Sequence, residues 1–545
     1  MVWIHFRELM LPSHRLSNGT EFFVYPLTQP STAEEPKIRP KDLVNVLAHP
    51  QTCTAVHPHP GSIFLGLGAS DPKGKERFPI WLPAPVLSSH VCIGGAIGSG
   101  KTTMLSRVVA GAIRTYGSVV ICEAKAGQQG GAEGAAFTNL TAYLKLRQPE
   151  LEVYRWPRGN CWFNPLLYIL APQDRRAFLD TVTQQIQDQH AVSGDMVAFL
   201  YNAANISEQV LLFLQRFIPK DRLTLRQWVN FMKHPLQFAR QLENMLQRSE
   251  EEEHQFLLEI KSQLGMLNFF YLNKPEFAMT RHGVNLFARS LDHEDLLWYS
   301  EPHAGLKELA IDQVLYRRSL VVVSLPLHDP ASRVLGPLFW DSLLARVLEL
   351  GPDPQPFKGQ QRERVLAVLD ETHRLPVGRL GESGDFLREF DLGLVEVTPA
   401  VVDLERWQRN QHVYQTIISL SPGVPAITEL IHERLPNYFL KPTYTSMHPN
   451  ENGQMQAVLN IRSDFKHQVS VDNPGVSLRS LQRTGRFTGL LQSTLLDDFC
   501  RAFWIDFEDN LLAKLPKLLE QALDPNCSAD ITAAVDYALG LAEFT

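Results

Sequence analysis

The stretch His90-Val91-Cys92-Ile93-Gly94-Gly95-Ala96-Ile97-Gly98-Ser99-Gly100-Lys101-Thr102-Thr103 contains the motif that decides the fold. From Gly95 to Thr102 it fits the pattern G-x-x-x-x-G-K-[ST], which is typical of a phosphate-binding loop. The apolar run of residues 91–93 predicts a short buried strand, and residues 104–113 predict a helix. The glycines therefore lie at the strand-to-helix turn that this motif requires.

The chemistry of such a loop explains its residue types. Glycines let backbone N–H groups face a phosphate chain, and the N-terminus of the following helix adds the positive end of its dipole. We expect the Lys101 ammonium to reach the outer phosphates and the Thr102 hydroxyl to complete the coordination of Mg²⁺. The positions expected to bind the phosphates are Gly95, Ala96, Ile97, Gly98, Ser99, Gly100, Lys101, Thr102 and Thr103. The alternative is a glycine-rich turn without a ligand, which the complete motif and its flanking elements disfavour.

Two carboxylates, Asp370 and Glu371, follow the apolar run of residues 365–369, which predicts another buried strand. Ligands of parallel sheets bind at the carboxyl ends of the strands, so we expect this pair beside the phosphate loop. Asp370 would hold Mg²⁺, directly or through water, next to Thr102, and Glu371 would polarise the attacking water. A nucleotide switch without turnover would not need the second carboxylate, so the pair favours hydrolysis. The alternative is a surface Asp-Glu pair that caps a helix.

Phosphoryl transfer also needs a cation on the developing negative charge, and a neighbouring subunit often supplies an arginine. Each candidate can equally be an ordinary surface arginine, and the residues alone do not choose among them. The candidates are Arg388, Arg406, Arg409, Arg483 and Arg486.

Composition sets limits on the class of protein. The chain has 545 residues, enough for more than one domain, with 44% hydrophobic and 20% charged residues. Its net charge of −7 argues against a general coating by nucleic acid, so any such contact is local, as in a ring or groove, or else absent. The six cysteines show no C-x-x-C spacing, as is usual in a reduced cytoplasmic compartment. Charges near the start argue against a signal peptide, and no stretch resembles the ~18 uncharged residues of a transmembrane helix, so we expect no integral membrane segment.

The rest of the chain predicts an α/β protein interrupted by helices. Short apolar strands are predicted at residues 118–122, 319–325, 393–398 and 415–420, whereas residues 172 to about 286 show only helical spacing. Residues 447–454 are predicted to form a loop. The predicted domains are a β-rich N-terminal region (1–83), a first part of the nucleotide-binding domain (84–168), an all-helical insertion (169–300), the second part of the nucleotide-binding domain (301–505) and a helical tail (506–545).

Over roughly residues 60–420 the chain resembles the RecA-like DNA motors with an additional strand. The resemblance is greatest to the type IV coupling proteins of the TraD/TraG group, with the HerA and FtsK translocases as wider relatives. The resemblance rests on His90 before the phosphate loop and on residues 119–127, which resemble a strand ending in Asp-x-Lys-Gly. It also rests on the helical insertion and on two short motifs, namely Phe163-Asn164-Pro165-Leu166 and Leu369-Asp370-Glu371 with Leu375-Pro376 after it.

This resemblance implies a RecA-like P-loop ATPase with a parallel central sheet, an inserted all-helical domain and a small β-rich N-terminal region. Such proteins are hexameric rings that use ATP and Mg²⁺ to move DNA through a pore. It therefore implies a homo-oligomer, DNA as a partner, and a protein partner for the helical insertion, which in the family helps to choose the substrate. Arg388 falls where the family carries its arginine finger, and Lys125 is a pore residue by analogy.

The chain departs from the family at three points. Thr398-Pro399 stands where the family usually has Thr-Gln or Ser-Gln, Glu123 replaces an Asp, and the family's N-terminal transmembrane helices are not recognised. The leading hypothesis is an ATP-driven DNA translocase or helicase that serves a mobile element, a defence system or a CRISPR-associated system. The alternative is an ATP-gated assembly scaffold or substrate-recruiting coupling factor with little translocation. A third hypothesis is a protein-secretion adaptor that lies against a membrane partner.

Overall fold

The computed structural model divides the chain into two compact parts, which are described separately. Unit 1 comprises residues 1–116, 135–147 and 393–545, and unit 2 comprises residues 117–134 and 148–392. The residues that the structure describes are 14–15, 21–26, 62–69, 78–123, 135–190, 194–325, 332–370, 384–399, 411–420, 424, 426–427, 430–431, 438–442, 446–449, 455–458, 488–493, 502–506 and 513–541.

Unit 1 is built around the strand that precedes the phosphate loop. This strand, β5 (Val91–Gly94), lies between β12 (Leu392–Thr398) and β13 (Thr416–Leu420) and is parallel to both. The strands beyond β13 are antiparallel neighbours in the order β17 (Thr488–Ser493), β18 (Ala502–Asp506), β3 (Ser62–Ala69) and β4 (Phe78–Pro83). All side chains of β5 are buried, which explains its uninterrupted apolar sequence.

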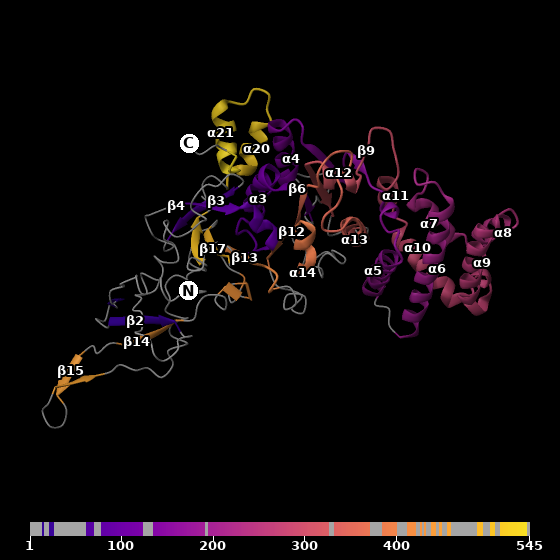
Figure 1. Cartoon of the computed structure of the whole chain (residues 1–545), viewed down its shortest axis with the longest axis horizontal. Helices are drawn as coiled ribbons and strands as arrows, with labels where there is room; N and C mark the ends of the chain where they lie inside the picture. The colour runs from indigo at the N-terminus through magenta and orange to yellow at the C-terminus, as the bar shows by residue number, and fades with distance from the viewer. Residues whose placement is uncertain are drawn as a thin grey trace. The chain divides into compact units, whose positions relative to one another are not determined.

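The helices of unit 1 pack on this sheet and on one another (Figure 1). They are α3 (Lys101–Thr115), α4 (Ala135–Arg147), α20 (Leu515–Ala522) and α21 (Ala529–Ala538). Helix α3 lies so close to β3 that a Cβ atom on Gly111 would come within 2.5 Å of Ile63 Cγ2. The last two helices lie within residues 506–545, the segment predicted as a helical tail.

Buried polar contacts attach this helical tail to the phosphate-loop helix. Arg107 of α3 is fully buried; its Nε donates to the Ala538 carbonyl and its Nη1 to the Leu65 carbonyl, both at 2.7 Å. The Asp536 carboxylate accepts from the Tyr143 hydroxyl at 2.8 Å and from Arg147 at 2.7 Å. Burial, together with this carboxylate, raises the pKa of Tyr143. Helix α21 is thus fixed to both α3 and α4.

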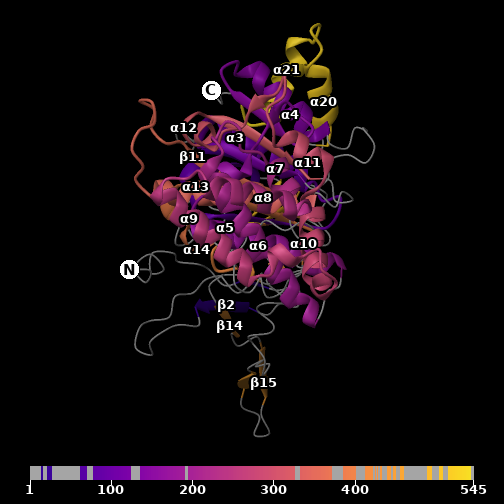
Figure 2. The ribbon, with the colours of Figure 1, turned by 90° about the vertical axis from the view of Figure 1, so that its right-hand side faces the viewer.

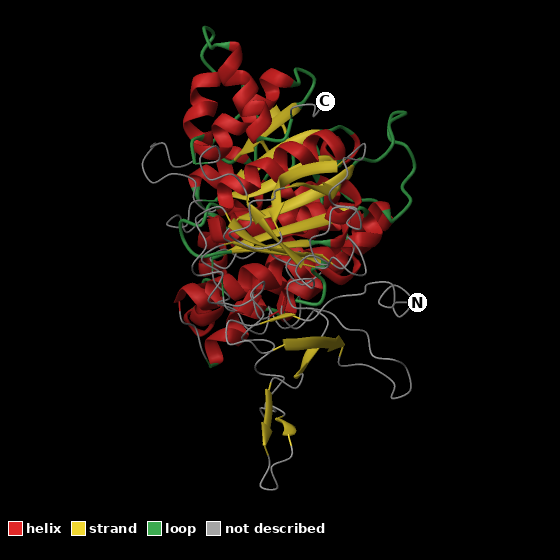
Figure 3. Ribbon diagram, turned by 90° about the vertical axis from the view of Figure 1, so that its left-hand side faces the viewer, coloured by secondary structure: helices red, strands yellow, loops and turns green. Residues whose placement is uncertain are grey.

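Four of the strands described in unit 2 are parallel neighbours, and β8 (Cys161–Trp162) and β9 (Lys307–Glu308) form a separate parallel pair. Strand β6 (Gly117–Glu123) lies between β11 (Arg364–Asp370) and β10 (Ser319–Ser324), and β7 (Glu152–Trp156) pairs with β10 on its other side. Figure 3 draws the strands of both units in yellow. The parallel strands of the two units confirm the predicted α/β class. Unit 2 also contains α12 (Ile311–Tyr316), α13 (Ser332–Leu350) and α14 (Gly384–Leu387).

Within residues 172–286 the described structure consists of helices joined by short turns (Figures 1 and 2). Helix α6 packs against α5, α7, α9 and α10. The helices are α5 (Pro172–His190), α6 (Asp195–Phe217), α7 (Leu225–Lys233), α8 (Pro235–Leu246), α9 (Glu251–Met266), α10 (Ala278–Leu291) and α11 (Glu294–Tyr299).

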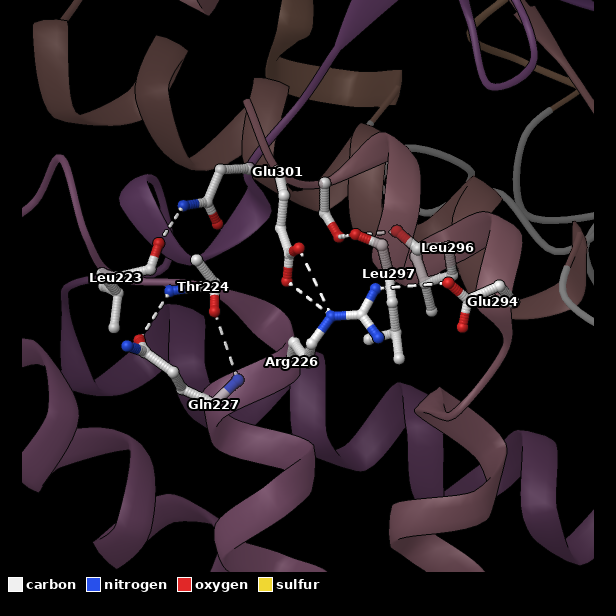
Figure 4. A network of polar contacts seen from close by, with 10 residues as sticks. Leu223, Thr224, Arg226, Gln227, Glu294, Leu296, Leu297 and Glu301 are labelled. Carbon is white, nitrogen blue, oxygen red and sulfur yellow. Dashed lines mark hydrogen bonds and ion pairs between the residues drawn. The ribbon is translucent and has the colours of Figure 1, made fainter. Parts of the chain in front are cut away.

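A polar network fixes the start of α7 (Figure 4). Thr224 and Gln227 form a capping box, in which each side chain binds the backbone N–H of the other. Arg226 donates to Glu301 at 3.2 Å and pairs with Glu294 at 3.4 Å, which ties α7 to the segment around α11. The Asn164 amide donates to the Leu223 carbonyl at 2.7 Å. Asn164, noted in the sequence as part of a family motif, is therefore an anchor for the helical region.

Two expectations need correction. Helix α6 contains one window, Met196–Phe217, with a mean hydropathy of 1.3, so a stretch of transmembrane length and composition does exist, although half of it is buried within the described structure. Part of the predicted loop at residues 447–454 is a strand, because β15 (Ser446–Pro449) pairs antiparallel with β16 (Met455–Val458). A further small sheet joins β1 (His14–Arg15), β2 (Glu21–Pro26) and β14 (Tyr438–Pro442).

We predict that Cys92, Cys122 and Cys161 resist alkylation in the native protein while Cys527 reacts. The first three are buried and Cys527 is half-buried. Burial chiefly raises the pKa of Cys122 and of Cys161 to about 12, so at about pH 8 only about one thiol in ten thousand is a reactive thiolate. Iodoacetamide labelling read by peptide mass spectrometry tests this.

The denatured chain is the control, in which all four cysteines should react. Because the folded pKa lies above the unfolded value of 9.0, ionisation of Cys122 favours unfolding only as the pH rises from about 9 toward 12. Labelling of native Cys122 as fast as Cys527 at about pH 8 would contradict the burial described above.

Candidate phosphate-binding site

The phosphate-loop motif forms the predicted strand-to-helix turn between β5 and α3. The Gly95 N–H donates to the Thr398 carbonyl at 3.3 Å, and the Ser99 N–H donates to the Ala96 carbonyl at 3.1 Å. Gly98 and Gly100 have φ angles of 82° and 94°, a left-handed backbone conformation that residues with a Cβ atom rarely adopt. The two glycines are therefore required by the shape of the loop.

Close packing holds the start of the loop in place. A Cβ atom on Gly95 would lie 2.5 Å from Ser99 Oγ and 2.9 Å from Leu420 Cβ, at the end of β13. A Cβ atom on Gly94 would lie 2.2 Å from Ile427 Cδ1. A larger residue at Gly95 would require the loop or β13 to shift, whereas at Gly94 the end of the Ile427 side chain would have to move.

The loop presents hydrogen-bond donors. Lys101 is 5% exposed, and its Nζ donates to the Gly95 carbonyl at 2.7 Å and the Ala96 carbonyl at 2.9 Å, so the ammonium lies over the loop itself. Ser99 Oγ is buried without a hydrogen-bond partner in the described part of the chain. The first N–H groups of α3 lack carbonyl partners within the helix. An ammonium, a buried hydroxyl and a helix N-terminus together fit the oxygens of a phosphate. Ile97, at the tip, is 82% exposed.

His90 connects β5 to both neighbouring strands. It is 2% exposed, with φ at 57°, and its Nδ1 accepts a hydrogen bond from the Leu394 N–H of β12 at 3.0 Å. On the other side, the Thr416 N–H of β13 donates to the His90 carbonyl at 3.3 Å. Because Nδ1 is the acceptor, the ring proton of the neutral imidazole is assigned to Nε2. The family residue noted in the sequence thus positions the strand that carries the loop.

In unit 2, two carboxylates end adjacent strands. Asp370 of β11 is opposite Glu123 of β6 in the parallel register, and the two residues are 1% and 3% exposed. The Leu325 N–H donates to the Glu123 carbonyl at 2.8 Å, which extends the pairing of β10 to this edge. Burying carboxylates is costly unless a cation compensates them, and oxygen ligands of this kind suit Mg²⁺. Glu371 lies outside the described residues.

The arginine candidates are described only in part. Arg388 is exposed in a 3-10 turn, η9 (Arg388–Phe390), immediately before β12. The other candidates lie outside the described residues, namely Arg406, Arg409, Arg483 and Arg486, as does Lys125. The roles of Lys101, Thr102, Asp370, Glu371 and Arg388 therefore remain predictions.

Two supports of the loop were missed from the sequence. Thr398 was noted in the sequence only because Pro399 follows it where the family has Gln, whereas its carbonyl accepts a hydrogen bond from the Gly95 N–H. Arg107 lies among the buried apolar residues of α3. A charged residue on an apolar helix face is the signal that could have identified it, because such a group must find buried acceptors.

Comparison with known proteins shows the fold. No protein-family model matches the chain, and no curated protein matches it in sequence. Among solved structures, the plasmid coupling protein TrwB in complex with the non-hydrolysable GTP analogue GDPNP is similar, with a TM-score of 0.51 and 9% identity over 89% of this chain and 94% of that one. The chain therefore has the fold of that protein.

Two further structures resemble the chain less. The unbound monoclinic form of the conjugative coupling protein TrwBdeltaN70 has a TM-score of 0.49 and 10% identity, over 88% of this chain and 93% of that one. VirB4 of Thermoanaerobacter pseudethanolicus has a TM-score of 0.45 and 13% identity, over 83% of this chain and 98% of that one.

We predict that His90→Leu lowers the free energy of unfolding by about 2 kcal/mol, because it leaves the buried Leu394 N–H without an acceptor. His90→Asn should lose much less, since Asn keeps an acceptor at the δ position and tolerates a positive φ. Urea unfolding followed by tryptophan fluorescence measures both variants. Equal losses in the two would show that the hydrogen bond to Leu394 is not what makes His90 important.

Proposed function

We propose that this chain is an ATP-hydrolysing ring motor of the coupling-protein type that translocates on or unwinds DNA. The observation that carries the proposal is the loop between β5 and α3, in which two left-handed glycines shape a turn lined by Lys101 and the buried Ser99 hydroxyl. TrwB, whose fold the chain shares, is described in complex with a GTP analogue. A nucleoside triphosphate in the loop is the ligand that fits both observations.

ATP and Mg²⁺ are the proposed ligands of the site. The loop from Gly95 to Thr103 would hold the phosphates through its N–H groups, and Lys101 would move from the loop carbonyls to the outer phosphates. Thr102 and Asp370 are the proposed protein ligands of Mg²⁺, which supplies charge neutralisation to the phosphates. Their donor types, a hydroxyl and a carboxylate, are those that Mg²⁺ prefers.

Hydrolysis needs a base and a cation in addition. Glu371 is proposed to polarise the attacking water, and Arg388 to stabilise the negative charge that develops during transfer. The exposure of Arg388 supports a role toward a neighbouring subunit of a homo-oligomer, in keeping with the hexameric ring that the family resemblance implies. DNA is the proposed polymer, and its contact must be local because the net charge is −7. A protein partner for the helical region completes the proposal.

The alternative, an ATP-gated scaffold with little translocation, is favoured by one observation. Thr398 ends β12 opposite Gly94 in register, is 5% exposed, and uses its carbonyl to hold Gly95. Pro399 follows where the family has the Gln that senses the terminal phosphate. The end of β12 thus supports the loop but provides no side-chain amide to report hydrolysis.

We predict that Gly95→Ala weakens ATP binding by about tenfold or more, because the new methyl group would collide with Ser99 and Leu420. The matched control is Gly265→Ala in α9, where an added Cβ meets nothing within 4 Å. Isothermal titration with ATP and Mg²⁺ measures both. Unchanged affinity in Gly95→Ala, with the fold intact, would exclude the loop as the nucleotide site.

We predict that DNA stimulates ATP turnover and that Lys101→Ala or Glu371→Gln lowers this turnover by about a hundredfold or more, because each removes a group that acts on the transition state. Lys220→Ala, at an exposed lysine of the helical region, is the control and should keep full activity. Phosphate release is followed with single- and double-stranded DNA while the mass of the protein is recorded.

The same experiment separates the two hypotheses. Movement of a labelled duplex or strand displacement excludes the scaffold. ATP-dependent oligomerisation with no strand displacement, and turnover that DNA never changes, excludes the motor.

A further inference from the structure

A pocket outside the nucleotide motifs lies in the helical region of unit 2. It has a volume of about 680 Å³ and is formed by the end of α7, the outer side of α8, the 3-10 turn η5 (Phe269–Tyr271) with the residues after it, and α10. Helices α8, α9 and α10 are visible on the near side in Figure 2. No motif of the proposed ATPase maps to this part of the chain.

The charged side chains that line the pocket are basic. They are Lys233, Arg240 and Arg281, and no Asp or Glu is among the lining residues. Lys233 is paired with Asp292, but Arg240 and Arg281 have no ion-pair partner within the described part of the chain. In a chain with a net charge of −7, two unpaired guanidinium groups in one pocket favour an anionic ligand.

Amide side chains provide most of the remaining polar lining. None of them has a hydrogen-bond partner in the described structure, so each offers both donors and an acceptor. They are Gln237, Gln241, Asn244 and Asn273. Such groups match the alternating N–H and C=O of an extended peptide backbone.

The apolar part of the lining distinguishes a peptide from nucleic acid. Proteins that bind single-stranded nucleic acid stack the bases on exposed aromatic rings. Among the residues lining this pocket, Phe269 is only 1% exposed and His234 carries the exposed aromatic ring, whereas the aliphatic Leu236 is 49% exposed. The pocket thus offers an aliphatic contact and a single exposed imidazole, whereas proteins that bind single strands stack successive bases on several rings.

We propose that this pocket binds an acidic peptide segment of a partner protein, with carboxylates on Arg240 and Arg281 and an aliphatic side chain on Leu236. This inference specifies the chemistry of the protein partner that the proposed function assigns to the helical region, and it rests on that part of the proposed function. Binding to the pocket needs no nucleotide, so a failure here leaves the ATPase proposal intact, and loss of ATPase activity does not affect this one.

The test is fluorescence anisotropy with the full chain and a labelled short peptide in which Glu alternates with Leu. Arg240→Glu combined with Arg281→Glu should weaken binding by about tenfold or more, because each lost arginine–carboxylate pair is replaced by repulsion. The control, Arg222→Glu combined with Arg248→Glu, makes the same change in net charge at exposed arginines outside the pocket and should leave binding unchanged. Circular dichroism of both double variants verifies the fold.

Binding of the acidic peptide that only the pocket variant loses, and that a matched Lys-Leu peptide does not show, supports the proposal. Equal losses in the two double variants would show general electrostatic attraction and overturn it. The proposal also fails if the wild-type chain does not bind the acidic peptide. It fails equally if a single-stranded oligonucleotide displaces the peptide and binds with higher affinity.

Discussion

Tight packing of the phosphate loop against the ends of its neighbouring strands is the constraint on which unit 1 depends. The loop starts where Gly94 and Gly95 have no room for a side chain, and the Thr398 carbonyl fixes its first N–H. It ends at α3, which Arg107 holds through the Leu65 and Ala538 carbonyls. An anion site made of backbone donors works only if the backbone is held rigidly, since the donors cannot adjust as a long side chain could.

A second constraint operates in unit 2, where Asp370 and Glu123 end paired strands in a buried position. A strand that is buried on both faces is apolar along its length, because a carboxylate in its middle would lose its hydration. The carboxylate of Asp370 therefore occurs at the end of the apolar run that precedes it. This is why a strand pattern, and not the acid alone, located the candidate metal ligand.

Local patterns in the sequence were enough to predict the parallel strands β5, β6, β10, β11, β12 and β13, helix α3 and the helical region. Elements whose identity depends on distant partners were missed. Strand β7 alternates polar and apolar residues and pairs only with β10 among the described strands. Strands β17 and β18 join the sheet by pairing with β13 and β3, which are distant in sequence. Of the candidate site, the motif residues could be predicted, but the acceptors of Arg107 lie 42 and 431 residues away in sequence.

Helix α7 joins two features of the helical region that were considered apart. The Leu223 carbonyl just before α7 accepts from the Asn164 amide, and Arg226 in its first turn donates to Glu301. Its last residue, Lys233, lines the pocket of the helical region. Nine helical residues make a rod about 13 Å long. A force applied to a peptide bound at Lys233 would therefore be carried along α7 to the contacts made by Asn164 and Glu301 at its other end.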